Sequence, residues 1–163
     1  MGRHPGIAHA LALAGHEIGN HTYSHRRLRP RVGWKLNLMS KQEVYEEFQR
    51  AQTAIVRATG AVPKLMRAPY GLRWVGMREA QLRLKLLGVM WTVIGHDWEW
   101  DAERVVEHVM ARVSPGGIIC LHDGRDTLAN PDVSQTLEAV KRLIPRLRDM
   151  GYEFETVGEI LRA

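Results

Sequence analysis

The sequence has a single cysteine and no long apolar run, and both absences narrow its class. Cys120 is the one cysteine among 163 residues, so no disulfide can close within the chain and no Cys/His zinc finger can be written. It lies in the run Gly-Gly-Ile-Ile-Cys-Leu, which predicts a small buried residue. No apolar stretch approaches the roughly 20 residues of a membrane span, and the N-terminus lacks a signal-peptide pattern. The chain as written is therefore expected to be cytoplasmic, with no membrane span.

The chain has only a small excess of positive charge. The chain carries 23 Lys+Arg against 18 Asp+Glu, a net charge of +5, and its 45% hydrophobic content suffices for one domain over residues 1–163. The densest basic run, Arg-Arg-Leu-Arg-Pro-Arg at 26–31, is short, contains a proline and has no interleaved aromatic residue. We therefore expect no nucleic-acid partner; a weaker alternative is a basic interaction protein with steeply salt-dependent polyanion binding.

Helical and strand patterns alternate along the chain, which predicts an α/β fold with about five parallel strands. In such folds functional groups collect where strands end and loops begin. The expected helices cover 5–14, 40–59, 75–87, a segment capped by Asp101, 132–149 with a bend or break near Pro145, and a last turn at 157–161. The expected strands cover 16–20, 63–69, 89–94, 118–122 and 152–156.

The first polar strand end is Gly-His-Glu-Ile-Gly-Asn-His-Thr-Tyr-Ser-His, residues 15–25. His21 and His25 are four residues apart and can meet at one ion, since imidazole is the commonest protein ligand for zinc, nickel, cobalt and iron. His16 does not start a His-Glu-x-x-His motif, because the next histidine comes five residues later and Gly19 interrupts a helix. On spacing alone, the alternative is a turn in which both histidines bond backbone carbonyls.

The next strand end is Arg67-Ala-Pro-Tyr70-Gly. An arginine there can orient a carboxylate bidentately, and the Pro-Tyr-Gly turn can aim a backbone N–H at a ligand. Taken alone, a surface arginine before an ordinary turn explains the pattern equally well.

Two later strand ends carry Asp97-Trp98 and His122-Asp123. Trp98 and Trp100 fit the core or the rim of a site. His122 fits either a structural role or, if Asp97 or Asp123 raises its pKa, a general acid.

These four segments, in this order and at these intervals, resemble the second to fifth motifs of the polysaccharide deacetylase (NodB-homology) family of carbohydrate esterases. The motifs are Gly-His-Glu-Ile-Gly-Asn-His-Thr-Tyr-Ser-His, Arg-Ala-Pro-Tyr-Gly, Asp-Trp and Ile-Ile-Cys-Leu-His-Asp-Gly, and the resemblance covers nearly the whole chain. It implies a deformed (β/α) barrel, here partial. It also implies metal-dependent removal of N-acetyl groups from an amino-sugar polymer such as chitin or peptidoglycan.

The resemblance also implies roles for individual residues. His21 and His25 would be two ligands of a divalent metal, zinc before cobalt, nickel or iron, with Thr22 and Ser24 shaping their loop. Arg67 would orient the catalytic carboxylate, and the backbone N–H of Tyr70 would hold the oxyanion.

For the other two motifs, Asp97 and Trp98 would belong to the fourth, Leu121 would line the acetyl pocket, and His122 would protonate the leaving amine. The expected partner is a carbohydrate substrate.

One family feature has no counterpart in the sequence. The first motif, a strand ending in two adjacent aspartates that supply the general base and the third metal ligand, is missing, and no Asp-Asp pair occurs anywhere. The chain also starts with residues that resemble the part of the family sequence located after its first two strands. We therefore expect a fragment, a misassigned start codon or a divergent non-catalytic relative, with the first two favoured.

A barrel without its first strands would expose unpaired edges, a predicted self-association site. The family works mostly outside the cytoplasm, so location stays open. The alternative function is a catalytically silent carbohydrate-binding module that keeps a groove lined by Tyr70, Trp98 and Trp100.

Overall fold

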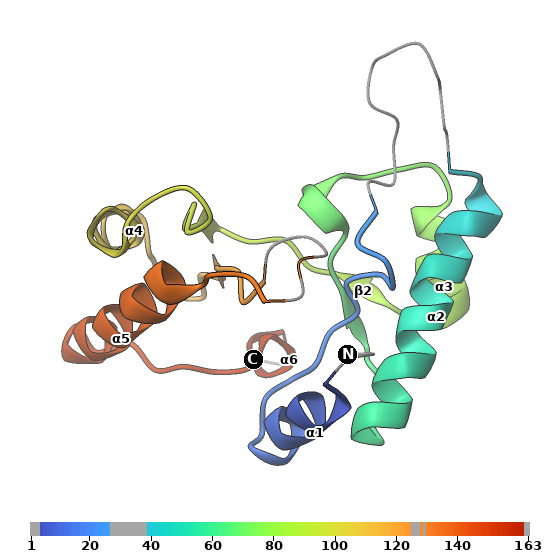
Figure 1. Cartoon of the computed structure of the whole chain (residues 1–163), viewed down its shortest axis with the longest axis horizontal. Coiled ribbons are helices and arrows are strands. Elements are labelled where there is room, and N and C mark those ends of the chain that lie inside the picture. The colour runs from blue at the N-terminus through green and yellow to red at the C-terminus, as the bar shows by residue number, and fades with distance from the viewer. Residues whose placement is uncertain (1–3, 27–38, 125–127, 129, 162–163) are drawn as a thin grey trace, which may run out of the picture. The chain divides into compact units, whose positions relative to one another are not determined.

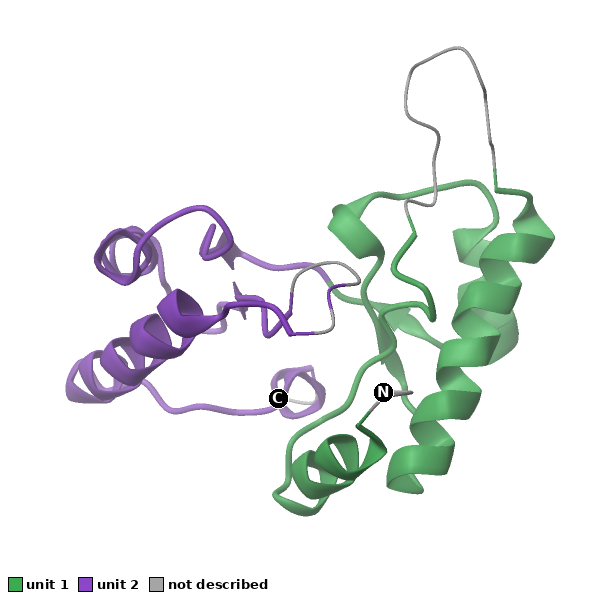
Figure 2. Cartoon of the chain, viewed as in Figure 1, with its two compact units in different colours: residues 1–89 green, residues 90–163 purple. Residues whose placement is uncertain are grey.

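A computed structural model describes residues 4–26, 39–124, 128 and 130–161. The chain divides into two compact units, residues 1–89 and 90–163 (Figure 2), and each is described by itself. In the described part, no helix is both long and apolar enough to span a bilayer.

The first unit contains three α-helices, one 3-10 turn and one pair of parallel strands among its described residues (Figure 1). The elements are α1 (Pro5–Leu13), α2 (Lys41–Thr59), β1 (Leu65–Met66), η1 (Pro69–Gly71), α3 (Met77–Leu84) and β2 (Leu87–Gly88).

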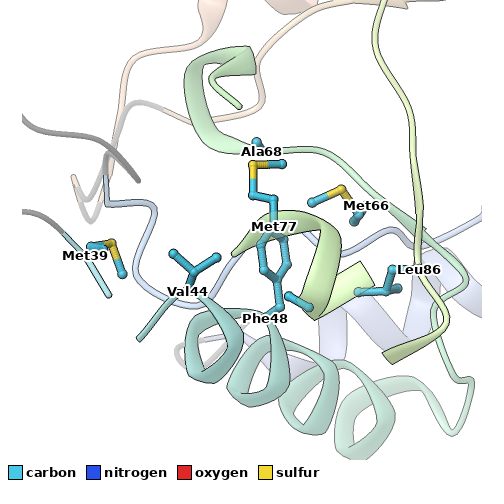
Figure 3. Close-up of a cluster of buried hydrophobic side chains, with 8 residues drawn as sticks. Met39, Val44, Phe48, Met66, Ala68, Met77 and Leu86 are labelled. Carbon is cyan, nitrogen blue, oxygen red and sulfur yellow. The ribbon is translucent and has the colours of Figure 1, made fainter. Parts of the chain in front are cut away.

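Helix α2 begins and ends as its sequence predicts. The Ser40 hydroxyl accepts the Glu43 N–H and the Glu43 carboxylate accepts the Ser40 N–H, a capping box, and Gly60 ends the helix at φ 74°. Its apolar stripe packs against residues of β1 and α3 (Figure 3). This cluster is the core of the first unit; its buried members are Met39, Val44, Phe48, Met66, Ala68, Met77, Ala80 and Leu86.

The second unit contains three α-helices and another pair of parallel strands among its described residues. The elements are β3 (Val93–Ile94), α4 (Ala102–Met110), β4 (Ile119–Cys120), α5 (Ser134–Asp149) and α6 (Val157–Ile160). Helices α4 and α5 pack together over β3, with Val105, Val106 and Val109 fully buried. Cys120 is buried, as its apolar setting predicts.

The strands are shorter and fewer than the sequence predicts. The described residues form four strands of two residues each, paired β1 with β2 and β3 with β4. The expected strand at 16–20 is one parallel bridge, Asn20 to Met66. Residues 152–156 form neither strand nor helix and have no partner strand among the described residues. Helix α3 ends at Leu84, because Lys85 after it is left-handed, and Leu87 and Gly88 form β2 where the sequence predicts a helix to 87. Helix α5 continues through Pro145.

Candidate active site

The loop that carries His21 and His25 begins beside β1. The Asn20 N–H donates to Leu65 O (2.9 Å) and the Arg67 N–H donates to Asn20 O (2.9 Å), so Asn20 pairs in parallel with β1. His21 and Arg67 are the next residues along these neighbouring segments, and parallel pairing brings their ends to the same edge.

A hydrogen bond to Arg67 fixes the tautomer of His21. Nδ1 of His21 lies 2.7 Å from Arg67 O. A carbonyl oxygen only accepts, so Nδ1 carries the proton and, in the neutral ring, Nε2 carries the lone pair. A metal-binding histidine is commonly oriented in this way by a carbonyl on its second nitrogen.

His21 and His25 come together in the first unit. Their ring centroids are 4.9 Å apart, and the His25 ring lies 5.0 Å from the Tyr70 ring. Thr22 and His25 have positive φ values of 64° and 54°, so the loop turns sharply between the two histidines. His16 lies on the turn after α1, where its N–H bonds Leu11 O, and its side chain is exposed.

The donor set fits two ligands of a divalent metal. Two imidazoles bound to one zinc at roughly 2.0–2.1 Å, with a tetrahedral angle between them, would have centroids about 5 Å apart. The 4.9 Å separation of His21 and His25 agrees with that distance, which is also that of an edge-on contact between two rings. No group of three or more His, Cys, Asp or Glu that could hold a metal occurs among the residues for which the structure gives positions.

The loop is tied to α2 by two polar side chains that sequence reasoning missed. The Asn20 side chain is 1% exposed; its amide donates to Phe48 O (2.9 Å) and Gln52 Oε1 (2.8 Å), and its oxygen accepts the Thr22 N–H (3.0 Å). Glu47, 6% exposed, accepts two hydrogen bonds from Ser24. A charge on the apolar face of a helix is the signal that could have identified Glu47.

Arg67 and Tyr70 lie beside this loop. The Arg67 guanidinium is half-buried and its Nε donates to Val89 O (3.1 Å). Tyr70 adopts a left-handed conformation (φ 59°, ψ 13°) within η1, which turns the chain directly after Pro69. The first unit thus groups four predicted site residues: His21, His25, Arg67 and Tyr70.

In the second unit, Asp97 is fully buried and holds His122. Asp97 Oδ1 lies 2.8 Å from His122 Nδ1, and Oδ2 accepts the His122 backbone N–H (2.7 Å). The sequence left Asp97 and Asp123 as possible partners of His122. The structure pairs His122 with Asp97, and Asp123 is exposed. The third donor to Asp97 is the Thr136 hydroxyl from the first turn of α5, at 2.7 Å, a residue that sequence reasoning missed.

The hydrogen bonds to Asp97 outweigh its burial. Burial alone would raise the pKa of Asp97, but the bonds from the His122 ring and amide and from Thr136 hold that pKa below its ordinary value. Asp97 is then an anion at neutral pH and accepts the Nδ1–H of His122, which leaves Nε2 as the nitrogen that gains or loses a proton.

Trp98 and Leu121 complete this group. The Trp98 ring lies edge-on to His122, with centroids 4.9 Å apart, and is 40% exposed. Leu121 follows β4 and its Cδ2 lies against Gly95, where an added Cβ would overlap it. Trp100 stacks on His96 (4.5 Å) and lies beneath the Arg104 guanidinium. The His96 ring also lies 5.0 Å from the Trp98 ring, so Trp100 is connected to Trp98 and His122 through His96.

The basic run at 26–31 is largely outside the described residues. Arg26 is exposed; the rest of the run lies in 27–38. The interaction-protein alternative therefore stays a prediction.

The structure is that of an α/β protein with functional groups at the ends of its parallel strands. Comparison with known proteins identifies its family. The model of the polysaccharide deacetylase family matches residues 1–89, more than half of the chain. A chitooligosaccharide deacetylase of Sinorhizobium fredii is 35% identical over 155 residues, covering 91% of this chain and 68% of that protein. The chain belongs to the polysaccharide deacetylase family.

A second curated deacetylase and one solved structure also resemble the chain. The peptidoglycan-N-acetylglucosamine deacetylase PgdA of Listeria monocytogenes is 30% identical over 159 residues, which cover 97% of this chain and 30% of that protein. The crystal structure of a CE4-family pseudoenzyme from Bacillus anthracis superposes with a TM-score of 0.81 at 24% identity, over 98% of this chain and 51% of that one. At this identity the likeness concerns the fold alone.

Proposed function

We propose that this chain is a metal-dependent N-deacetylase that hydrolyses the acetamide of N-acetylglucosamine units in a chitin-like polymer or peptidoglycan. The observation that carries the proposal is the approach of the His21 and His25 rings to 4.9 Å, with His21 Nδ1 held by Arg67 O. Relatives named chitooligosaccharide and peptidoglycan-N-acetylglucosamine deacetylases support the substrate class.

We propose further that residues 1–163 form one domain of the deformed (β/α) barrel type, of which the two units are parts. The parallel pairing of β1 with β2 and of β3 with β4 supports this arrangement. The open strand edges of such a partial barrel remain our proposed self-association site.

His21 and His25 would hold the divalent metal, with zinc first among the candidates because imidazole nitrogen is a preferred zinc ligand. When bound, the metal polarises the acetyl carbonyl and lowers the pKa of a water molecule. The carbonyl of Arg67 keeps His21 in the tautomer that presents Nε2. The backbone N–H of Tyr70 would donate to the oxyanion, beside the His25 ring.

His122 would act as the general acid. Ionised Asp97 stabilises the protonated imidazole through Nδ1, and Nε2–H gives its proton to the leaving amine. Trp98, exposed beside His122, would contact the sugar ring, and Leu121 would line the acetyl pocket. The family resemblance gives Arg67 the role of orienting the catalytic carboxylate, although the sequence holds no adjacent aspartate pair to supply it.

The alternative candidate is a silent carbohydrate-binding module, and a specific observation favours it. The sequence contains no adjacent aspartates, the pair that the family resemblance implies as base and third ligand. A general base typically contributes roughly 10²–10⁴-fold in rate, so we expect this chain to be slow in comparison with a complete relative.

Acetate release from N-acetylated chitooligosaccharides by the 163-residue chain separates the two candidates. We expect slow release that needs added Zn²⁺ or Co²⁺ and is abolished by His122→Ala, with His16→Ala as a control. Sugar binding with no acetate released above the His122→Ala background would instead support the binding module.

A further inference from the structure

Glu47 is a carboxylate on the apolar side of helix α2. It lies three residues after Val44 and one before Phe48, both fully buried and shown in Figure 3, and it is itself 6% exposed. Burying a charge costs free energy unless hydrogen bonds compensate, and an aliphatic residue would extend the same stripe without that cost. The packing of α2 therefore does not account for Glu47.

The compensation comes from one residue of the histidine loop. A single oxygen of Glu47, Oε2, accepts the Ser24 backbone N–H at 2.9 Å and the Ser24 hydroxyl at 2.8 Å. Ser24 directly precedes His25, so these bonds fix the backbone from which the second histidine projects.

The loop needs such fixing because its backbone is unfavourable. Thr22 and His25 both have φ near +60°, a conformation that is unfavourable for a non-glycine residue and persists only where the surroundings enforce it. Asn20 enforces it at the start through Thr22, and Glu47 enforces it at the end through Ser24. Both anchors rest on α2, since Asn20 also donates to Phe48 O and Gln52.

We propose that Glu47 is a positioning residue that holds the loop in the conformation in which His21 and His25 face one ion. The inference rests on the metal-binding role proposed above. Glu47 acts by accepting hydrogen bonds from Ser24, which preorganises the loop, so that metal binding does not have to order it.

Metal titration by calorimetry, with Zn²⁺ as the probe, tests the inference on three variants of the full chain. Glu47→Leu should weaken Zn²⁺ binding by roughly 10-fold, the low end of the effect of losing a direct hydrogen-bond partner of a ligand, because Glu47 acts through Ser24. Glu47→Gln should stay within about threefold of wild type, because one amide oxygen can accept both Ser24 bonds. Glu46→Gln, on the exposed neighbour, is the matched control and should leave affinity unchanged.

Wild-type affinity in Glu47→Leu, or equal losses in Glu47→Leu and Glu47→Gln, would overturn the inference. If Glu47→Leu does not fold, Ser24→Ala tests the inference instead, because it removes only the hydrogen bond from the Ser24 hydroxyl to Glu47. An unchanged Zn²⁺ affinity in Ser24→Ala would also overturn the inference.

Amide hydrogen exchange on the metal-free chain separates this inference from the proposed function. Glu47→Leu should accelerate exchange of the Ser24 backbone N–H by at least about tenfold. Exchange of the Asn20 backbone N–H, which donates to Leu65 O, should not change. Suppose that Ser24 exchanges faster in Glu47→Leu but that wild type binds no Zn²⁺. That result would refute the metal-binding role and, with it, the proposal that Glu47 positions metal ligands. Unchanged Ser24 exchange would refute the positioning role alone.

Discussion

Asp97 is the residue on which the second unit's candidate site depends. Its buried carboxylate accepts hydrogen bonds from the His122 ring, the His122 amide and the Thr136 hydroxyl. These donors keep it ionised despite burial, and the ionised form sets which nitrogen of His122 holds the exchangeable proton.

Thr136→Val should raise the pKa of Asp97 toward its ordinary value, because valine keeps the shape of threonine but removes one donor. Thr136→Ser, which keeps the hydroxyl, should restore the wild-type pKa. Carbon NMR titration of the Asp97 carboxyl measures both. Identical titration of Thr136→Val and wild type would show that the hydroxyl does not stabilise the anion.

Stability should depend on the ionisation of Asp97 in acid. Because the pKa of Asp97 is lowered in the folded state, the unfolded chain binds the proton more tightly, and the contribution is present above the unfolded pKa of about 3.9 and lost as pH falls through the folded value. We expect the free energy of unfolding to fall more steeply below about pH 4 in wild type than in Asp97→Asn. Urea titrations at several pH values measure the slopes; parallel slopes would contradict the account.

At the residue scale, sequence order predicted which groups would gather but not what holds them. The pairing of His122 with Asp97 and the contact between His21 and His25 are among the possibilities that motif spacing left open. Asn20, Glu47 and Thr136 escaped prediction because their partners are 23 to 39 residues away and come from other elements. The position of Glu47 on an apolar helix face could have indicated burial, but only the packing shows that its partner is Ser24.

At the element scale, local signals predicted the helices better than the strands. The Ser40 capping box and the left-handed glycine at position 60 mark both ends of α2, since caps depend on adjacent residues. A strand exists only where a partner pairs with it. Residues 152–156 have strand-forming composition yet no partner strand among the residues with known placement, and β2 forms because Leu87 pairs with Leu65.

A side chain at position 95, directly after β3, should displace Leu121. A Cβ on Gly95 would overlap the Cδ2 methyl of Leu121 and lie at ordinary contact distance, 3.5 Å, from Cys120 O. Because the end of the Leu121 side chain can move, Gly95→Ala should destabilise the fold by about 1 kcal/mol, the low end of overpacking. Gly124→Ala, with nothing within 4 Å, is the control. Equal urea midpoints for the two variants would show that Leu121 yields freely and is not fixed by this contact.

At the scale of the whole molecule, each unit carries one part of the proposed chemistry. The first holds the histidine pair with Arg67 and Tyr70, and the second holds His122 on Asp97 with Trp98. The family assignment covers residues of both units, because the Sinorhizobium relative aligns with 91% of the chain.

The most direct test of the account is Zn²⁺ titration of the 163-residue chain, wild type against His21→Ala and His25→Ala. The ring geometry predicts one bound equivalent in wild type and at least about tenfold weaker binding in either variant, with His16→Ala unchanged. Zn²⁺ binding that is the same in all four proteins, or absent from wild type, would contradict the claim that His21 and His25 form a metal site.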